Sequence, residues 1–250
     1  MGSLAVDQRK VSSIGRDLPH RLHTRGYNVA LTGRWAAAGE ALAKALDTTG
    51  RTTLFAECHA VCRVVWDKWA RIDALVANAG IVDKESRYGL ARRSASVDDV
   101  PPCPDLGCND ADFKGVVYGT ELATHYARHN PPGVRGGKIV VTGCIFAIYP
   151  CPTFPKYCAV KAAALQWVRA LAPVLLAKVN IAINTDESHT KTGQAIETVY
   201  ESHYYHDVPE YKSGNVIERT DKVYEPLFQW MHSERSGLPN AYKEPQRKTT

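Results

Sequence analysis

Tyr157 and Lys161 are the residues whose types and spacing most directly suggest chemistry. They lie four residues apart at the start of an Ala-rich segment that predicts a helix, so both side chains are expected on one helical face. An ammonium group beside a phenol stabilises the phenolate, and the pair therefore predicts a Tyr157 pKa below the ordinary value of about 10. Such a tyrosine can exchange a proton with a carbonyl or hydroxyl group near neutral pH. Because this spacing also occurs by chance on surface helices, its interpretation depends on the surrounding elements.

Hydrophobic strands and amphipathic helices alternate along most of the chain. The first two helices are expected to end at Gly26 and near Gly50, since glycine is favoured just beyond a helix C-terminus. This alternation predicts an α/β fold in which a parallel sheet is covered by helices on both faces. The predicted strands lie at 4–6, 28–32, 52–58, within 72–80, at 138–143 and at 179–184, and the predicted helices at 16–25, 35–46, 111–129, 157–178 and 223–232.

Three segments occur in an order that is typical of one family. A strand running into Asn-Ala-Gly at 72–80, a strand ending in Thr-Gly at 138–143, and Tyr157 with Lys161 together resemble the short-chain dehydrogenase/reductase family over most of residues 3–192. The resemblance implies a Rossmann-like, doubly wound parallel sheet with helices on both faces. It also implies a single domain over residues 1–232 with a substrate lid at 193–222, followed by a polar tail at 233–250.

The resemblance also marks four positions of a proton relay. Tyr157 and Lys161 match the family, whereas Asp112 stands in the place of an asparagine and Cys144 in the place of a substrate-binding serine. An ionised aspartate cannot donate a hydrogen bond, and a thiol donates more weakly than a hydroxyl. We therefore predict Tyr157, Lys161, Cys144 and Asp112 as catalytic candidates. Cys144 is equally well interpreted as a small residue at a strand end that lines the site.

The dinucleotide motif of the family is altered in this chain. In the family, the glycines of the first turn let backbone N–H groups approach a pyrophosphate. Here Arg9 replaces one of them and Gly15 remains, while Arg34 follows the second strand, where members that prefer NADP(H) place a cation. Arg9 either blocks this phosphate site or serves as a phosphate ligand. The cofactor-binding candidates are Arg9, Gly15, Arg34, Asn78 and Gly80.

Two further segments depart from the family on the same side of the fold. The segment that follows the third strand is short and is interpreted as lacking the acidic residue beside the adenine. Residues 185–192 contain neither Pro nor Gly where the family has a Pro-Gly turn beside the nicotinamide. These changes favour the loss of dinucleotide use, so no cofactor is the first prediction, and NADP(H) is the prediction if the phosphate site is retained.

Aromatic and histidine side chains are the candidates for substrate contact. Helical spacing of Tyr200, His203 and Tyr204 would place them on one face of the lid. Tyr149 and His189 complete the predicted substrate set. The alternative is that these rings pack the lid against the core or a second subunit. The last predicted helix is expected to complete the cover of the sheet.

Composition excludes several classes of protein. The chain has 250 residues, 44% of them hydrophobic, and we find no apolar run of membrane-spanning length and no export signal, so we predict a cytoplasmic protein. The net charge of +5 is dispersed, which disfavours nucleic-acid binding. Seven scattered cysteines lack a complete metal-ligand spacing, and no metal is predicted. The resemblance implies a homodimer or homotetramer, and the sequence is similar to fungal members associated with secondary metabolism.

Three functions remain open at this level. The first is an enzyme that catalyses a non-redox step on a small carbonyl-bearing metabolite, either a cyclisation (including a pericyclic one), an isomerisation or a dehydration, with Tyr157 and Lys161 as the acid/base pair. The second is an NADP(H)-dependent ketoreductase or alcohol dehydrogenase. The third is a catalytically silent binding or oligomer partner.

Overall fold

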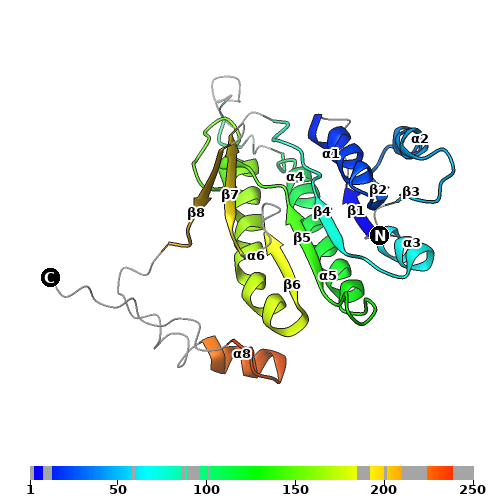
Figure 1. The fold of residues 1–250 in the computed structure, drawn as a ribbon. Helices are drawn as coiled ribbons and strands as arrows, with labels where there is room; N and C mark the ends of the chain where they lie inside the picture. The colour runs from blue at the N-terminus through cyan, green and yellow to red at the C-terminus, as the bar shows by residue number, and fades with distance from the viewer. Residues whose placement is uncertain are drawn as a thin grey trace.

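A six-stranded parallel sheet forms the centre of the molecule in a computed structural model (Figure 1). The structure describes residues 3–7, 13–57, 60–85, 88, 96–98, 100, 102–184, 192–199, 202–209 and 224–238. The strand order is β3-β2-β1-β4-β5-β6, so the order reverses between β1 and β4. This confirms the predicted Rossmann-like sheet. The strands are β1 (Ser3–Asp7), β2 (Asn28–Thr32), β3 (Thr53–Ala56), β4 (Ala74–Ala77), β5 (Gly137–Val141) and β6 (Ile181–Asn184).

Alternate residues of the strands pack into two hydrophobic layers, one on each face of the sheet, as the two-residue period of a strand requires. In β2, Ala30 packs on one face of the sheet, while Val29 and Leu31 pack on the other. β4 divides in the same way, with Leu75 on the first face and Val76 on the second. Both faces of the inner strands are therefore apolar, which is why these strands are continuous hydrophobic segments in the sequence.

The helices divide between these two layers. The first face is covered by α3 (Val61–Trp69), α5 (Gly115–Ala127) and α6 (Pro155–Val179), whose buried residues join one core cluster. The second face receives α1 (Ser13–Thr24) and α2 (Ala36–Leu46). α1 contains Pro19 in its interior.

The helix α6 corrects the prediction that the chain has no apolar run of membrane-spanning length. Among the described residues it is the helix whose length and mean hydropathy, 1.3 over 18 residues, would suffice to cross a bilayer. It instead packs on the sheet, burying Val160, Leu165 and Val168. We therefore interpret α6 as a core helix. The cytoplasmic location stays a prediction.

Two predicted elements differ in the structure. A helical spacing was considered for Tyr200, His203 and Tyr204 of the lid, but β7 (Ala195–Val199) and β8 (Ser202–His206) form an antiparallel pair of strands. A run of histidine and tyrosine side chains suits a strand as well as a helix, and cross-strand pairing decides between them. The last helix, α8 (Glu225–His232), was expected to cover the sheet. It lies beside the end of α6 through contacts of Lys178, and none of its described residues is buried (Figure 1).

Candidate active site

Tyr157 and Lys161 lie in the first turns of α6, beside the carboxyl ends of β4 and β5. The Lys161 side chain is almost completely buried, and its Nζ donates a hydrogen bond of 3.0 Å to the Thr142 carbonyl oxygen. The same Nζ lies 3.6 Å from Oδ2 of Asp112 and 5.6 Å from the centroid of the Tyr157 ring. Three of the four predicted relay positions therefore meet, and the lysine is held by a backbone carbonyl and a carboxylate.

Asp112 is positioned by a change in helix geometry. The short helix α4 (Gly107–Asn109) continues into a π-helical turn, η2 (Asp110–Lys114), before α5 begins. A π turn inserts one extra residue and rotates the side chains that follow. Asp112, in the middle of this turn, is 0% exposed and accepts a hydrogen bond of 2.7 Å from the Ile81 N–H. It is thus a buried partner of Lys161 and has no surface open to a substrate.

Gly80 is required by this arrangement. A Cβ atom added at residue 80 would lie 2.8 Å from Asp112 Oδ2 and 3.4 Å from Lys161 Nζ. Any side chain would therefore displace the buried carboxylate. The sequence marked Gly80 as a cofactor-binding candidate, and its contact in the structure is with the relay.

The Tyr157 phenol differs from the sequence prediction. Burial raises its pKa above the ordinary range, and the adjacent Cys144 side chain and the negative charge of Asp112 raise it further. The predicted lowering of the Tyr157 pKa by Lys161 is wrong, because burial of the phenol has the larger effect. Tyr157 is accordingly a neutral phenol at physiological pH, suited to donating a proton or a hydrogen bond.

Cys144 lies at the end of β5, just before the short 3-10 helix η3 (Ile145–Ala147), and is partly exposed. Its side chain is within hydrogen-bonding contact of Tyr157, so the structure places it in the site. A second thiol, Cys158, accepts a hydrogen bond from the Cys151 N–H at 3.3 Å. Cys144 therefore contributes a thiol in contact with the Tyr157 phenol.

Asn78 links the ends of two strands. Its Oδ1 accepts a hydrogen bond of 3.0 Å from the Thr142 hydroxyl, and the carbonyl oxygen of the same threonine accepts from Lys161. Asn78 was predicted as a cofactor-binding residue. In the structure it also supports the residue that holds Lys161 in place.

Asp83 is a residue of the site that the sequence analysis missed. Its two carboxylate oxygens accept hydrogen bonds from the N–H groups of Lys156, at 3.1 Å, and Tyr157, at 2.7 Å. A carboxylate in this position satisfies free N–H groups at the start of α6 and interacts favourably with the helix dipole. Because Asp83 lies 74 residues before Tyr157, no local sequence pattern indicates this cap.

We expect Asp83→Ala to lower the free energy of unfolding by about 1 kcal/mol, the usual cost of losing a helix cap. Asp83→Asn should restore part of that loss, because its amide oxygen can still accept one of the two hydrogen bonds. Denaturant unfolding of the two variants beside the wild type measures the difference. Equal stability of wild type and Asp83→Ala would show that the cap does not hold α6.

Three of the predicted cofactor residues near the first two strands are Arg9, Gly15 and Arg34. Arg9 and the loop 185–190 lie outside the described residues. Gly15 is buried in the first turn of α1, and Arg34 is exposed just beyond the carboxyl end of β2. The buried Thr32 hydroxyl, at the end of β2, has no hydrogen-bond partner among the described residues. A free hydroxyl beside an exposed arginine fits the ribose and 2′-phosphate of NADP(H).

The interpretation that the adenine wall lacks an acid needs correction. β3 ends at Ala56, so the next residue, the exposed Glu57, stands directly after the third strand. An acidic residue is therefore present at the carboxyl end of β3. The strand ends two residues earlier than residue 58, where the sequence predicts its end.

The predicted substrate residues are only partly brought together. The exposed Tyr149 packs edge-on against His206 of β8, with ring centroids 6.1 Å apart. His206 in turn pairs with Glu197 Oε2 at 2.9 Å, and this pair was not among the predicted site residues. His203 pairs across the hairpin with Thr198 at 3.1 Å, and Tyr204 is exposed on the alternate face of β8. His189 and Tyr200 lie outside the described residues.

Comparisons with known proteins agree with this fold. The sequence profile of the short chain dehydrogenase family matches residues 10–188. The short-chain dehydrogenase/reductase prx6 of Penicillium rubens is 38% identical over 92% of this chain and 91% of its own length. The short-chain dehydrogenase/reductase prx7 of the same fungus is 32% identical over 48% of this chain and 43% of its own length. The chain therefore belongs to the short-chain dehydrogenase/reductase family.

Solved structures show the same fold at lower identity. A putative short-chain alcohol dehydrogenase from Sinorhizobium meliloti is 23% identical, with a TM-score of 0.57 over 73% of this chain and 69% of that protein. Acetoin dehydrogenase YohF from Salmonella typhimurium is 19% identical, with a TM-score of 0.57 over 74% of this chain and 71% of its own. At this identity the likeness concerns the fold alone.

Proposed function

We propose that the protein reduces a carbonyl group of a small metabolite with NADP(H), and that Tyr157 is the proton donor. The observation that carries the proposal is the neutral, half-buried phenol beside the buried Lys161 and Asp112 pair. A phenol whose pKa is raised stays protonated at physiological pH. It can therefore donate to a carbonyl oxygen as negative charge develops there.

The carboxyl edge of the sheet supports the cofactor part of this proposal. The crevice where the strand order reverses, between β1 and β4, is the usual ligand position in open α/β sheets. Arg34 would hold the 2′-phosphate, and Gly15 would allow the cofactor to approach α1. When bound, NADP(H) supplies the hydride that reduces the carbonyl carbon. Three departures from the family favoured loss of the cofactor. Glu57 supplies the acidic residue that was thought to be missing after the third strand. The other two departures, in the first turn and at residues 185–192, lie mainly outside the described residues.

Lys161 and Asp112 have positioning roles in this proposal. Lys161 is oriented by the Thr142 carbonyl and lies beside the Tyr157 ring, while Asp112 compensates its charge inside the protein. Cys144 contacts the phenol and lines the substrate side of the site. We infer that burial, with Cys144 and Asp112 beside the phenol, keeps Tyr157 protonated. This is the form that can donate a proton in the direction of reduction, whereas oxidation needs a proton acceptor.

A second candidate, a non-redox isomerisation, cyclisation or dehydration, is favoured by the histidine pair of the hairpin. The His206 and Glu197 side chains lie 2.9 Å apart, and the His206 ring packs on Tyr149. A histidine oriented by a carboxylate can act as a general base. His206 would then remove a proton from the substrate while Tyr157 donates a hydrogen bond to its carbonyl. Asp112 is excluded as that base by its complete burial.

Binding of NADPH separates the two candidates. We expect saturable binding of NADPH, with a rise in the thermal midpoint, because a ligand of the folded state stabilises it by RT ln(1 + [L]/Kd). Arg34→Ala should weaken the affinity for NADPH by about 10- to 100-fold, which corresponds to the loss of a charge-assisted contact of about 1.5–3 kcal/mol.

NADH is the matched control, because it lacks the 2′-phosphate. Its affinity should be nearly the same in the wild type and in Arg34→Ala. Absence of NADPH binding at millimolar concentration would contradict the reductase proposal and favour the non-redox candidate. An equal loss of NADPH and NADH binding would show that Arg34 does not bind the 2′-phosphate.

A further inference from the structure

A hollow of about 770 Å³ lies at the opposite edge of the sheet from Tyr157. It is formed by the turns that lead into β2, β4, β5 and β6, at the amino ends of these strands. Its volume is within the range of about 300–1,000 Å³ that is usual for small-molecule sites. The proposed carbonyl chemistry uses none of these residues, so the hollow is available for another ligand.

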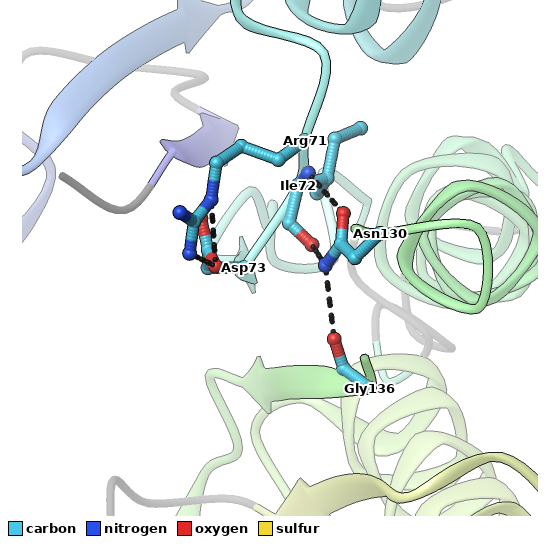
Figure 2. A network of polar contacts seen from close by, with 5 residues as sticks. All are labelled: Arg71, Ile72, Asp73, Asn130 and Gly136. Carbon is cyan, nitrogen blue, oxygen red and sulfur yellow. Dashed lines mark hydrogen bonds and ion pairs between the residues drawn. The ribbon is translucent and has the colours of Figure 1, made fainter. Parts of the chain in front are cut away.

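Two of the turns that line the hollow are joined by one buried side chain, Asn130, shown in Figure 2. Asn130 is 2% exposed, and its amide donates to the carbonyl oxygens of Ile72, at 2.8 Å, and Gly136, at 3.0 Å. Its Oδ1 accepts from the Ile72 N–H at 2.9 Å. The turns before β4 and β5 are therefore tied to each other, which fixes the shape of the site before any ligand arrives.

Close packing fixes the turn before β5 further. Gly136 has φ +98°, in the left-handed region that favours glycine. A Cβ added there would lie 2.1 Å from the Asn180 carbonyl oxygen, so only glycine fits. The Asn180 side chain also donates to the Arg135 carbonyl oxygen at 3.1 Å. The backbone that carries Arg135 is thereby anchored at both Gly136 and Asn180.

The lining of the hollow is strongly cationic. Among the described residues that line it, four contribute a positive charge, Arg25, Arg71, Arg135 and Lys138, and one contributes a carboxylate, Asp73. The Arg71 Nε donates to both oxygens of Asp73, at 3.1 and 2.9 Å, so the one acidic group is already neutralised by the most buried of the four cations (Figure 2). The other three cations are exposed. With four cations to one carboxylate, the described residues that line the hollow carry a net positive charge.

We propose that this hollow, which we call the amino-edge site, binds a small molecule that carries two or more phosphate groups. Three of its four cations are arginines, whose planar guanidinium groups match phosphate oxygens in bidentate geometry. Tyr27, Val134 and Leu176 add apolar surface that can receive the organic part of such a molecule. The site is distinct from the proposed dinucleotide site, because Arg34 lies at the carboxyl end of β2 and Arg25 before its amino end.

Inorganic pyrophosphate is the probe that tests the charged part of the site on the full-length protein. We expect saturable binding by calorimetry that weakens strongly when salt rises from about 50 to about 300 mM, since screening acts on exposed charges. Arg135→Glu should weaken binding by about tenfold or more, because a cation is lost and a repulsive carboxylate is introduced. Arg25→Glu should act in the same direction, and each thermal midpoint reports that the variant is folded.

Arg63→Glu is the matched control, with the same charge change at an exposed position of α3 that is not part of the hollow's lining. It should leave pyrophosphate affinity within about twofold of the wild type, because Arg63 does not line the hollow and exposed charges are screened by salt. An equal effect of Arg63→Glu and Arg135→Glu would overturn the proposal, as would the absence of saturable binding. Competition between NADPH and pyrophosphate would also overturn the proposal, because it would show that pyrophosphate binds at the carboxyl edge of the sheet. Citrate binding as tightly as pyrophosphate would refute the preference for phosphate.

Discussion

Replacing Tyr157 with Phe is expected to lower kcat for carbonyl reduction by about 10²- to 10⁴-fold, the usual contribution of a general acid. The phenol is the group in the site whose raised pKa keeps a transferable proton at physiological pH. Phenylalanine retains the ring that lies 5.6 Å from Lys161, so packing in the site should persist. Steady-state kinetics on a panel of carbonyl substrates with NADPH measures the effect.

The pH profile provides an independent test of the same role. Because the donor must be protonated and its pKa is raised, the rate of reduction should stay level from neutral pH past the ordinary tyrosine pKa of about 10. The reverse oxidation should be slow at neutral pH and accelerate on the alkaline side. Unchanged kcat in Tyr157→Phe would refute the role of Tyr157 outright. A decline in reduction that begins below pH 9 would contradict the raised pKa.

The second large effect concerns the buried ion pair of Lys161 and Asp112. Lys161→Met should lower the free energy of unfolding by about 3–5 kcal/mol, because it leaves a buried carboxylate without its cation. Asp112→Asn removes the carboxylate beside the Lys161 ammonium, although the hydrogen bond to the Thr142 carbonyl oxygen remains. This variant should therefore also destabilise the fold. The double variant should cost less than the sum of the two by about 1–3 kcal/mol, since neither charge then remains buried. Denaturant unfolding of all four proteins gives the coupling energy.

The exposed pair of Arg63 and Asp67 on α3 is the matched comparison. Its atoms lie 2.9 Å apart, closer than Lys161 and Asp112, but its side chains are 70% and 53% exposed. Solvent screening should limit its coupling energy to about 0.5 kcal/mol or less. Equal coupling in the two cycles would show that burial does not strengthen the Lys161 pair, and additive effects at Lys161 and Asp112 would show that the two do not interact.

Most of the fold was predictable from the sequence for a local reason. Residues such as Val29, Ala30 and Leu31 form a short continuous apolar segment between helical segments, and this pattern is typical of an inner parallel strand. The four-residue spacing of Tyr157 and Lys161 likewise depends only on helical periodicity. Sequence was a poorer guide for the lid, because His203 and Tyr204 suit either a strand or a helix until they are paired with the residues of β7.

The amino-acid sequence by itself therefore determined the order of the strands and helices, the two core faces and the place of Tyr157 and Lys161 on one helix. Only the tertiary structure decided the chemical state of that pair. Asp112 reaches Lys161 because of the π turn, and Asp83 caps α6 across 74 residues of chain. A pKa depends on burial and on every nearby charge, and these come together only when distant segments pack. For that reason the spacing of Tyr157 and Lys161 predicts a phenolate, whereas in the folded protein Tyr157 is a neutral proton donor.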